Sequence, residues 1–129
     1  MSTRCNIIIK WQNKKIVLYH HHDGYPEGVG RDLKFYLSKI HYWCDEAIAR
    51  NLVKNTAGLR DNEYEPSMGL HGDIEYVYEI DCWREKLTCY EIDWLAPKTS
   101  YKKNGRKVEI PAVPADYQPM YWNSIAYAQ

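Results

Sequence analysis

The sequence predicts an α+β fold, with a mainly antiparallel sheet built from hairpins and one long helix packed on it. Short stretches alternate apolar and polar residues, which is the period of strands, and one longer stretch repeats apolar residues every three or four positions, as helices do. The chain of 129 residues has the length of one domain, and its 45% hydrophobic content is that of a globular protein. We therefore expect a single domain over residues 1–129, in which residues 111–129 form a C-terminal arm.

The first predicted hairpin joins strands at Asn6–Trp11 and Lys15–His20 through a tight turn near Asn13 and Lys14, because asparagine tolerates the positive φ of such turns. The expected cross-strand pairs are Trp11 with Ile16, Ile9 with Leu18 and Ile7 with His20. This register gathers the apolar side chains on one face, which we expect to be core, with His20 at its rim.

The predicted helix runs from Val29 to Leu52 and is the clearest periodic signal in the chain. Its buried stripe consists of Val29, Leu33, Tyr36, Leu37, Ile40, Cys44, Ala47, Ile48 and Leu52. Residues Asn55–Gly58 supply the stop signal. A break near Trp43–Asp45 would give two shorter helices, and the sequence leaves this alternative open.

After a long connection at 59–73, alternation returns at Ile74–Ile80 and Thr88–Trp94. The expected pairs of this second hairpin are Ile80 with Thr88 and Tyr78 with Tyr90. The opposite face then carries the carboxylates of Glu75, Glu79, Asp81, Glu91 and Asp93. A solvated surface is the simplest interpretation of this acidic face, with a metal, acid–base chemistry or a docked basic segment left open. In this register Cys82 and Cys89 point to opposite sides of the sheet and form no disulfide.

A third hairpin is predicted at Tyr101–Ile110, because Asn104 and Gly105 both accept the positive φ of a two-residue turn. The arm that follows is interrupted by prolines but rich in aromatic residues. We expect it to pack on its own domain or on a neighbour.

Basic and acidic residues balance at seventeen each, so the net charge favours neither nucleic acid nor an anionic membrane. The charges are nevertheless segregated: residues 1–60 carry ten basic and five acidic side chains, 61–93 two and ten, and 94–129 five and two. We expect ordinary ion pairs between these segments. No long apolar segment, signal peptide or Cys-x-x-C pattern is present, which predicts a cytoplasmic protein with buried thiols.

The segment from His20 to Arg31 joins a strand to a helix and allows three interpretations. In the first, the helix start forms an anion site, whose ligand-binding residues would be His21, His22, Tyr25, Gly28, Gly30 and Arg31. In the second, His20 and His22 join His71 or Asp73 as metal ligands. In the third, which carries the most weight, Asp23, Gly24 and Pro26 only build a turn.

The same segment, written H-x-D-G-Y-P-E-G-V-G from His21 to Gly30, resembles a group of small uncharacterised proteins of bacteriophages and prophages. The resemblance extends from Met1 to Leu37 and again over Glu75–Asp81. It implies an accessory protein that acts in the cytosol of an infected bacterium, and it implies no mechanism.

We therefore expect a non-catalytic, phage-type binding protein that captures a host protein or an anionic, nucleotide-like ligand, for instance to counter host defence. No cofactor and no nucleic-acid partner are predicted, and a homo-oligomer is left open. The alternative is a small metal-dependent phosphoester hydrolase that uses His20, His22, His71 or Asp73 with one of the strand carboxylates.

Overall fold

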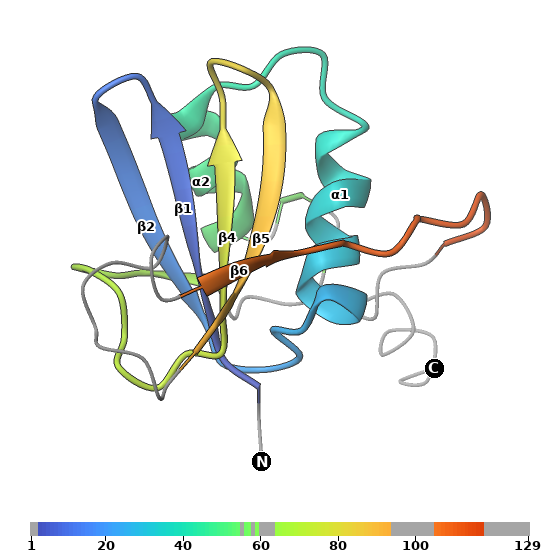
Figure 1. The fold of residues 1–129 in the computed structure, drawn as a ribbon. Coiled ribbons are helices and arrows are strands. Elements are labelled where there is room, and N and C mark those ends of the chain that lie inside the picture. Colours follow the sequence, from blue (N-terminus) through green and yellow to red (C-terminus); the bar gives the residue numbers. More distant parts are fainter. Residues whose placement is uncertain (1–2, 55, 58, 60–63, 94–104, 118–129) are drawn as a thin grey trace.

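The computed structural model describes residues 3–54, 56–57, 59, 64–93 and 105–117. Its strands are β1 (Cys5–Trp11), β2 (Lys14–His20), β3 (Tyr64–Pro66), β4 (Tyr76–Asp81), β5 (Lys86–Ile92) and β6 (Gly105–Val108). Its helices are the π-helical turn η1 (Pro26–Gly30), α1 (Arg31–Leu37) and α2 (Asp45–Val53). The strands form one sheet in the order β3-β2-β1-β4-β5-β6, and α1 and α2 lie behind it in the view of Figure 1.

The sheet is mixed, so the predicted sheet of antiparallel hairpins is wrong. The two hairpins β1-β2 and β4-β5 meet through their first strands, and β1 and β4 are parallel. A parallel pair needs a long crossover, and the chain between β2 and β4 supplies it through both helices and β3. Alternation within a strand does not reveal which strand will be its neighbour, so the sequence pattern could not show this pairing.

The predicted long helix is also wrong, because the chain leaves the helix after Leu37 and re-enters it at Asp45. Ser38 closes α1 by donating its hydroxyl to the Phe35 carbonyl, at 2.7 Å. The run from Ile40 to Trp43 is β-branched and aromatic, and such residues have low helix propensity. The break is therefore wider than the alternative at Trp43–Asp45 allowed.

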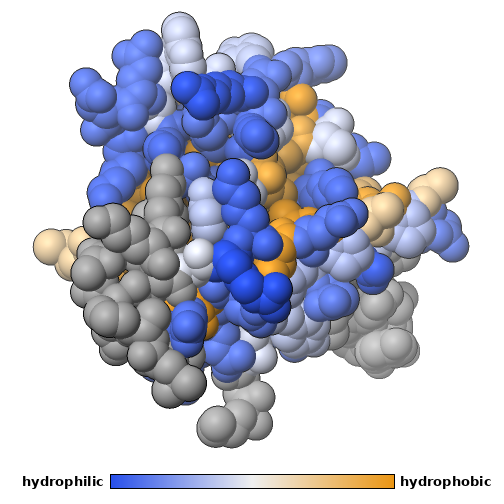
Figure 2. Space-filling model, viewed as in Figure 1, coloured by the Kyte–Doolittle hydropathy of each residue, from blue (hydrophilic) through white to orange (hydrophobic). Residues whose placement is uncertain are grey.

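Two apolar clusters lie on opposite faces of the sheet. The larger one, between sheet and helices, includes Ile7, Ile9, Leu18, Leu33, Leu37, Ile48, Leu52, Tyr78 and Ile80. The smaller one, on the other face, consists of Ile8, Tyr19, Ile74, Val77 and Tyr90. Most of the predicted stripe thus faces the core, although it is carried by two helices. Cys44 is an exception: it is exposed, so the prediction that it is a buried thiol is wrong. In Figure 2 the apolar surface of the face away from the helices is broken into strips between charged side chains.

The first hairpin pairs Trp11 with Lys14 and Ile9 with Ile16, two positions away from the predicted register. Its turn consists of Gln12, at φ 53°, and Asn13. A shift of two positions keeps every side chain on its face, so Ile7, Ile9 and Leu18 lie in the core as predicted. Trp11 on the same face is exposed, and His20 is fully buried instead of lying at the rim.

The second hairpin pairs Tyr78 with Cys89 and Ile80 with Leu87, one position away from the predicted register. The turn Cys82–Glu85 sets this pairing, with Glu85 at φ 54° and the Asp81 carboxylate accepting the amides of Trp83 and Arg84. A shift of one position moves every β5 side chain to the opposite face of the sheet from the predicted one.

The predicted acidic face is therefore wrong, because the carboxylates do not oppose one another: Glu79 lies opposite Thr88 and pairs with Lys10 at 3.6 Å. Cys82 and Cys89 are free thiols as predicted, but the reason was wrong, since both lie in the core under the helices.

Gly105 lies within β6 and pairs with Ile92 of β5, so the chain does not turn at this glycine as predicted. The other residues of that turn, 101–104, lie outside the described part. Beyond β6, Tyr117 donates its hydroxyl to the Asp32 carboxylate, and its ring lies 5.6 Å from the Phe35 ring. The described portion of the predicted arm thus packs on α1 of its own domain, and residues 118–129 lie outside the described part.

Candidate functional site

The loop between β2 and α1 uses its polar groups within the chain. The amides of Gly28 and Gly30 donate to the Tyr25 carbonyl and that of Val29 to the Asp23 carbonyl, at 2.8 to 3.5 Å. The Tyr25 hydroxyl donates to the Asp23 carboxylate at 2.9 Å. The amides that would have formed the predicted anion cradle therefore already have acceptors.

The glycines of this loop allow chain to approach chain. A Cβ on Gly28 would lie 2.3 Å from the Asp23 carbonyl oxygen, and one on Gly30 would lie 3.2 Å from the Tyr78 ring. Tyr78 is fully buried and donates its hydroxyl to the Gly24 carbonyl at 2.6 Å. The loop thus has a structural role, and ligand contact by His21, His22, Tyr25 and Arg31 stays a prediction.

The four candidate metal ligands do not converge. His20 is buried on the helix side of β2, beside the Tyr64 ring, and its Nδ1 accepts the His22 amide at 3.3 Å. His71 lies on the other face, where its ring stacks on Tyr19 with centroids 3.7 Å apart. Within the described ranges, no three His, Cys, Asp or Glu side chains are arranged to hold a metal ion. No observation here favours the hydrolase alternative.

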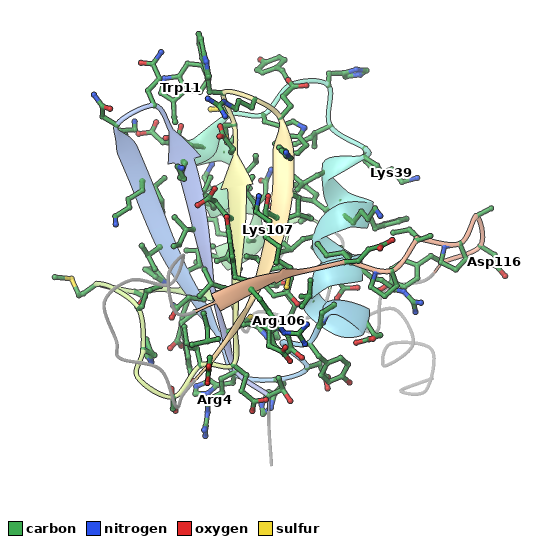
Figure 3. The ribbon with its side chains drawn as sticks, in the orientation of Figure 1. Arg4, Trp11, Lys39, Arg106, Lys107 and Asp116 are labelled. Atoms are coloured by element: carbon green, nitrogen blue, oxygen red, sulfur yellow. The ribbon has the colours of Figure 1, made fainter. Side chains whose placement is uncertain are left out.

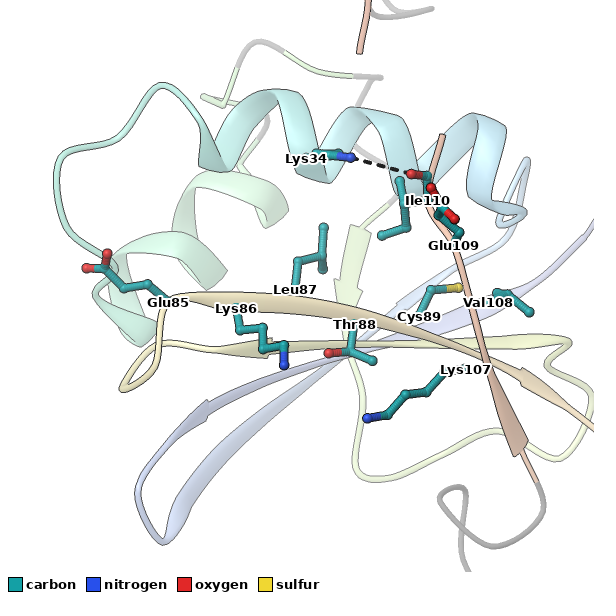
Figure 4. A pocket seen from close by; sticks show the side chains of 10 residues that line it. All are labelled: Lys34, Glu85, Lys86, Leu87, Thr88, Cys89, Lys107, Val108, Glu109 and Ile110. Atoms are coloured by element: carbon teal, nitrogen blue, oxygen red, sulfur yellow. Dashed lines mark hydrogen bonds between the residues drawn. The ribbon is translucent and has the colours of Figure 1, made fainter. Parts of the chain in front are cut away.

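A cavity of about 500 Å³, which we call the edge pocket, lies where β5, β6 and α1 meet (Figure 4). Its lining residues are Lys34, Glu85, Lys86, Leu87, Thr88, Cys89, Lys107, Val108, Glu109 and Ile110. Lys34 connects α1 to the segment that follows β6, because its Nζ donates to the Ile110 carbonyl at 3.4 Å.

The edge pocket contains an open length of sheet edge. β6 pairs only with the second half of β5, where Val108 lies opposite Cys89 and Gly105 opposite Ile92. After Val108 the chain turns away to α1, so no described residue pairs with Lys86–Thr88 on that side. Unpaired edges of this kind are templates for another strand.

The backbone of Leu87 points into this opening. The amide of Ile92 donates to the Glu75 carbonyl, on the β4 side of β5, at 2.9 Å. Amides alternate sides along an antiparallel strand, so Leu87 directs its N–H and C=O to the other side, where β6 has already left. One donor and one acceptor therefore face the edge pocket.

A smaller apolar pocket adjoins the edge pocket. It has a volume of about 200 Å³ and is lined by Lys34, Leu37, Ser38, Trp43 and Leu87. Lys34 and Leu87 line both cavities, so the two lie side by side along β5. The apolar pocket lies beneath the break between α1 and α2, because Leu37, Ser38 and Trp43 flank that break.

The single thiol in the edge pocket is not a nucleophile. The pKa of Cys89 is raised to about 12, mainly by burial; the nearby Glu91 and Glu27 carboxylates contribute to the rise, and a hydrogen bond with Tyr78 opposes it. A thiol with this pKa is protonated near neutral pH, and the thiolate is the reactive form. The edge pocket is suited to binding rather than to covalent chemistry.

The sequence prediction missed Lys34, Leu87 and Lys107 as site residues. These residues lie on α1, β5 and β6, three elements that only the fold brings together. One signal was present: Pro111 follows shortly after β6 and cannot donate to a ladder, which limits how far β6 extends along β5.

No protein-family model, curated protein or solved structure matches this chain. The helices that the structure describes include none long and apolar enough to cross a membrane. The functional argument therefore starts from the fold and the edge pocket.

Proposed function

We propose that this protein is a non-catalytic binding protein that captures an extended segment of another protein at the open edge of β5. The observation that carries the proposal is the backbone of Leu87, which pairs with no described residue on the side that faces the edge pocket. A segment added there would complete the antiparallel row that β6 begins, and its main-chain hydrogen bonds would supply affinity.

The bacteriophage resemblance supports a host protein as the partner and the bacterial cytosol as the setting. Capture of a host segment requires no cofactor and no reactive residue, only a strand edge and flanking pockets. The open length Lys86–Thr88 spans about 10 Å at strand spacing, so the captured segment is short.

The test selects octapeptides from a random display library on the immobilised protein and follows amide exchange of the protein by NMR. We expect a selected peptide to slow exchange of the Leu87 amide, because strand addition gives that amide an acceptor. The Ile92 amide is bonded to β4 with or without peptide and serves as the internal reference.

N-methylation of the selected peptide provides a matched control on its own backbone. Methyl groups on the amides that face β5 should weaken binding by about tenfold each, and those on the intervening amides should have little effect. Failure to select any peptide, or selected peptides that leave the Leu87 amide unchanged, would contradict strand addition.

A further inference from the structure

We infer that the segment captured at the β5 edge alternates apolar and acidic side chains, the apolar ones facing α1 and the acidic ones facing Lys86 and Lys107. This inference rests on the proposed function, since it describes the ligand of the same site. It follows from the different chemistry of the two sides of β5.

The two sides of β5 are distinguished by the packing of the strand. Leu87 and Cys89 belong to the apolar cluster under the helices, and Tyr90 belongs to the cluster on the other face. Lys86 and Thr88 share the face of Tyr90 by alternation, and Lys107 joins them because it lies opposite Tyr90. Figure 4 shows Leu87 on the α1 side of the ribbon and Lys86, Thr88 and Lys107 on the other.

On the α1 side, the apolar pocket offers room for one side chain. Its walls are Leu37, Trp43 and Leu87, and its volume is about 200 Å³. A cavity of about 150 Å³ holds a benzene ring, so this pocket admits a side chain of the size of leucine, methionine or phenylalanine. A residue of an added strand that faces α1 would place its side chain there.

On the other side, the lining residues are two lysines and a threonine, Lys86, Lys107 and Thr88. Among the described residues neither lysine forms an ion pair, whereas the nearby Arg106 is paired with Glu91 at 2.5 Å. The whole edge pocket has three lysines and two glutamates, so its lining carries an excess positive charge. Acidic side chains at the intervening positions of the segment would complement it.

The segment takes the place that β6 would have occupied had it continued past Val108. An antiparallel orientation to β5 continues the row of β6 and gives the more stable ladder. Lys34 marks the junction of the two pockets, where its ammonium is already oriented by the Ile110 carbonyl.

The experiment measures the affinity of an acetylated, amidated octapeptide in which leucine alternates with glutamate. Matched peptides replace every glutamate by glutamine or lysine, or every leucine by alanine. We expect the leucine–glutamate peptide to bind best and to weaken as salt is raised, and the lysine peptide to bind at least about tenfold more weakly.

Protein variants assign each preference to its residues. The Lys86→Gln, Lys107→Gln double variant removes two positive charges and should weaken binding of the leucine–glutamate peptide by about fivefold. The control is Lys15→Gln, which changes an exposed lysine of β2 and should leave binding unchanged.

Trp43→Ala should abolish the advantage of leucine over alanine in the peptide. Trp83→Ala, which removes an exposed ring packed on Trp11, should preserve it.

The outcomes separate this inference from the proposed function. Equal affinity for the glutamate and lysine peptides overturns the inference. It is also overturned if library-selected peptides protect the Leu87 amide while the leucine–glutamate peptide does not bind, and the proposed function then stands. Both fail if no peptide protects Leu87.

Discussion

Gly28 is required by the fold of its loop, and a side chain at this position has no room. Because a Cβ would lie 2.3 Å from a backbone oxygen of Asp23, Gly28→Val must displace the loop that holds α1. We expect a loss of at least about 2 kcal/mol of unfolding free energy, measured by urea denaturation. Gly72→Ala is the control, since nothing lies within 4 Å of its Cβ, and equal stability of the two variants would contradict this packing.

Because of its buried thiols, the protein should lose stability as the pH becomes alkaline. Burial raises the pKa of Cys89 from 9.0 to about 12, so between these values the folded state keeps a proton that the unfolded chain loses. Its contribution is therefore complete below pH 9 and is lost as the pH rises toward 12, by about 1.4 kcal/mol per pH unit.

Cys89→Ala should make the fall in stability above pH 9 less steep, although the variant is less stable at neutral pH. Urea denaturation from pH 8 to 10.5 measures the slope. Cys44→Ala serves as the control because Cys44 is exposed. An unchanged slope in Cys89→Ala would show that this thiol does not titrate as its burial requires.

The elements of the fold were predictable where one local pattern decides them. The stripe from Val29 to Leu52 indicated which side chains are buried, because a helix must place its apolar residues on one side. It could not show the break after Leu37, since residues at helical spacing continue through the link by coincidence. The β5 register depended on a turn whose positive φ falls on Glu85, a residue that gives no turn signal.

The candidate site was not predictable from local patterns. An open edge exists only because β6 is shorter than β5 and then leaves for α1, which depends on the relation between three elements. The glycine-rich loop was predicted as the site because glycines let other groups come close to the backbone. The sequence does not show whether a ligand or the chain itself comes close.

The α1 helix supplies a direct test of the core. Leu37 is 5% exposed and contributes to the apolar pocket as well as the core. Leu37→Asp should abolish cooperative folding, because it buries a charge without a partner, whereas His41→Asp in the exposed link should fold normally. Thermal unfolding followed by circular dichroism checks both, and an unchanged midpoint for Leu37→Asp would contradict the packing of α1 on the sheet.

At the scale of the whole molecule, the segregated charges of the sequence are brought together by the sheet. Acidic residues of the middle segment pair with basic residues from both ends of the chain: Asp73 with Arg4, Glu79 with Lys10 and Glu91 with Arg106. Arg4 and Trp11 mark opposite ends of the sheet in Figure 3, and Lys10 is next to Trp11 in the chain, so the pairs of Arg4 and Lys10 lie toward different ends. The expectation of ordinary ion pairs between segments is confirmed for these residues.

These ion pairs should differ in energy according to burial. The Glu79 side chain is 9% exposed and that of Lys10 27%, whereas the side chains of Glu91 and Arg106 are 37% and 76% exposed. Lys10→Met leaves a buried carboxylate without this cation and should cost about 1 to 3 kcal/mol of unfolding free energy. Arg106→Met should change it by less than about 1 kcal/mol, because the pair is screened by solvent. Urea denaturation at low and high salt measures both, and equal losses would show that burial does not set the strength of the pairs that connect the charged segments.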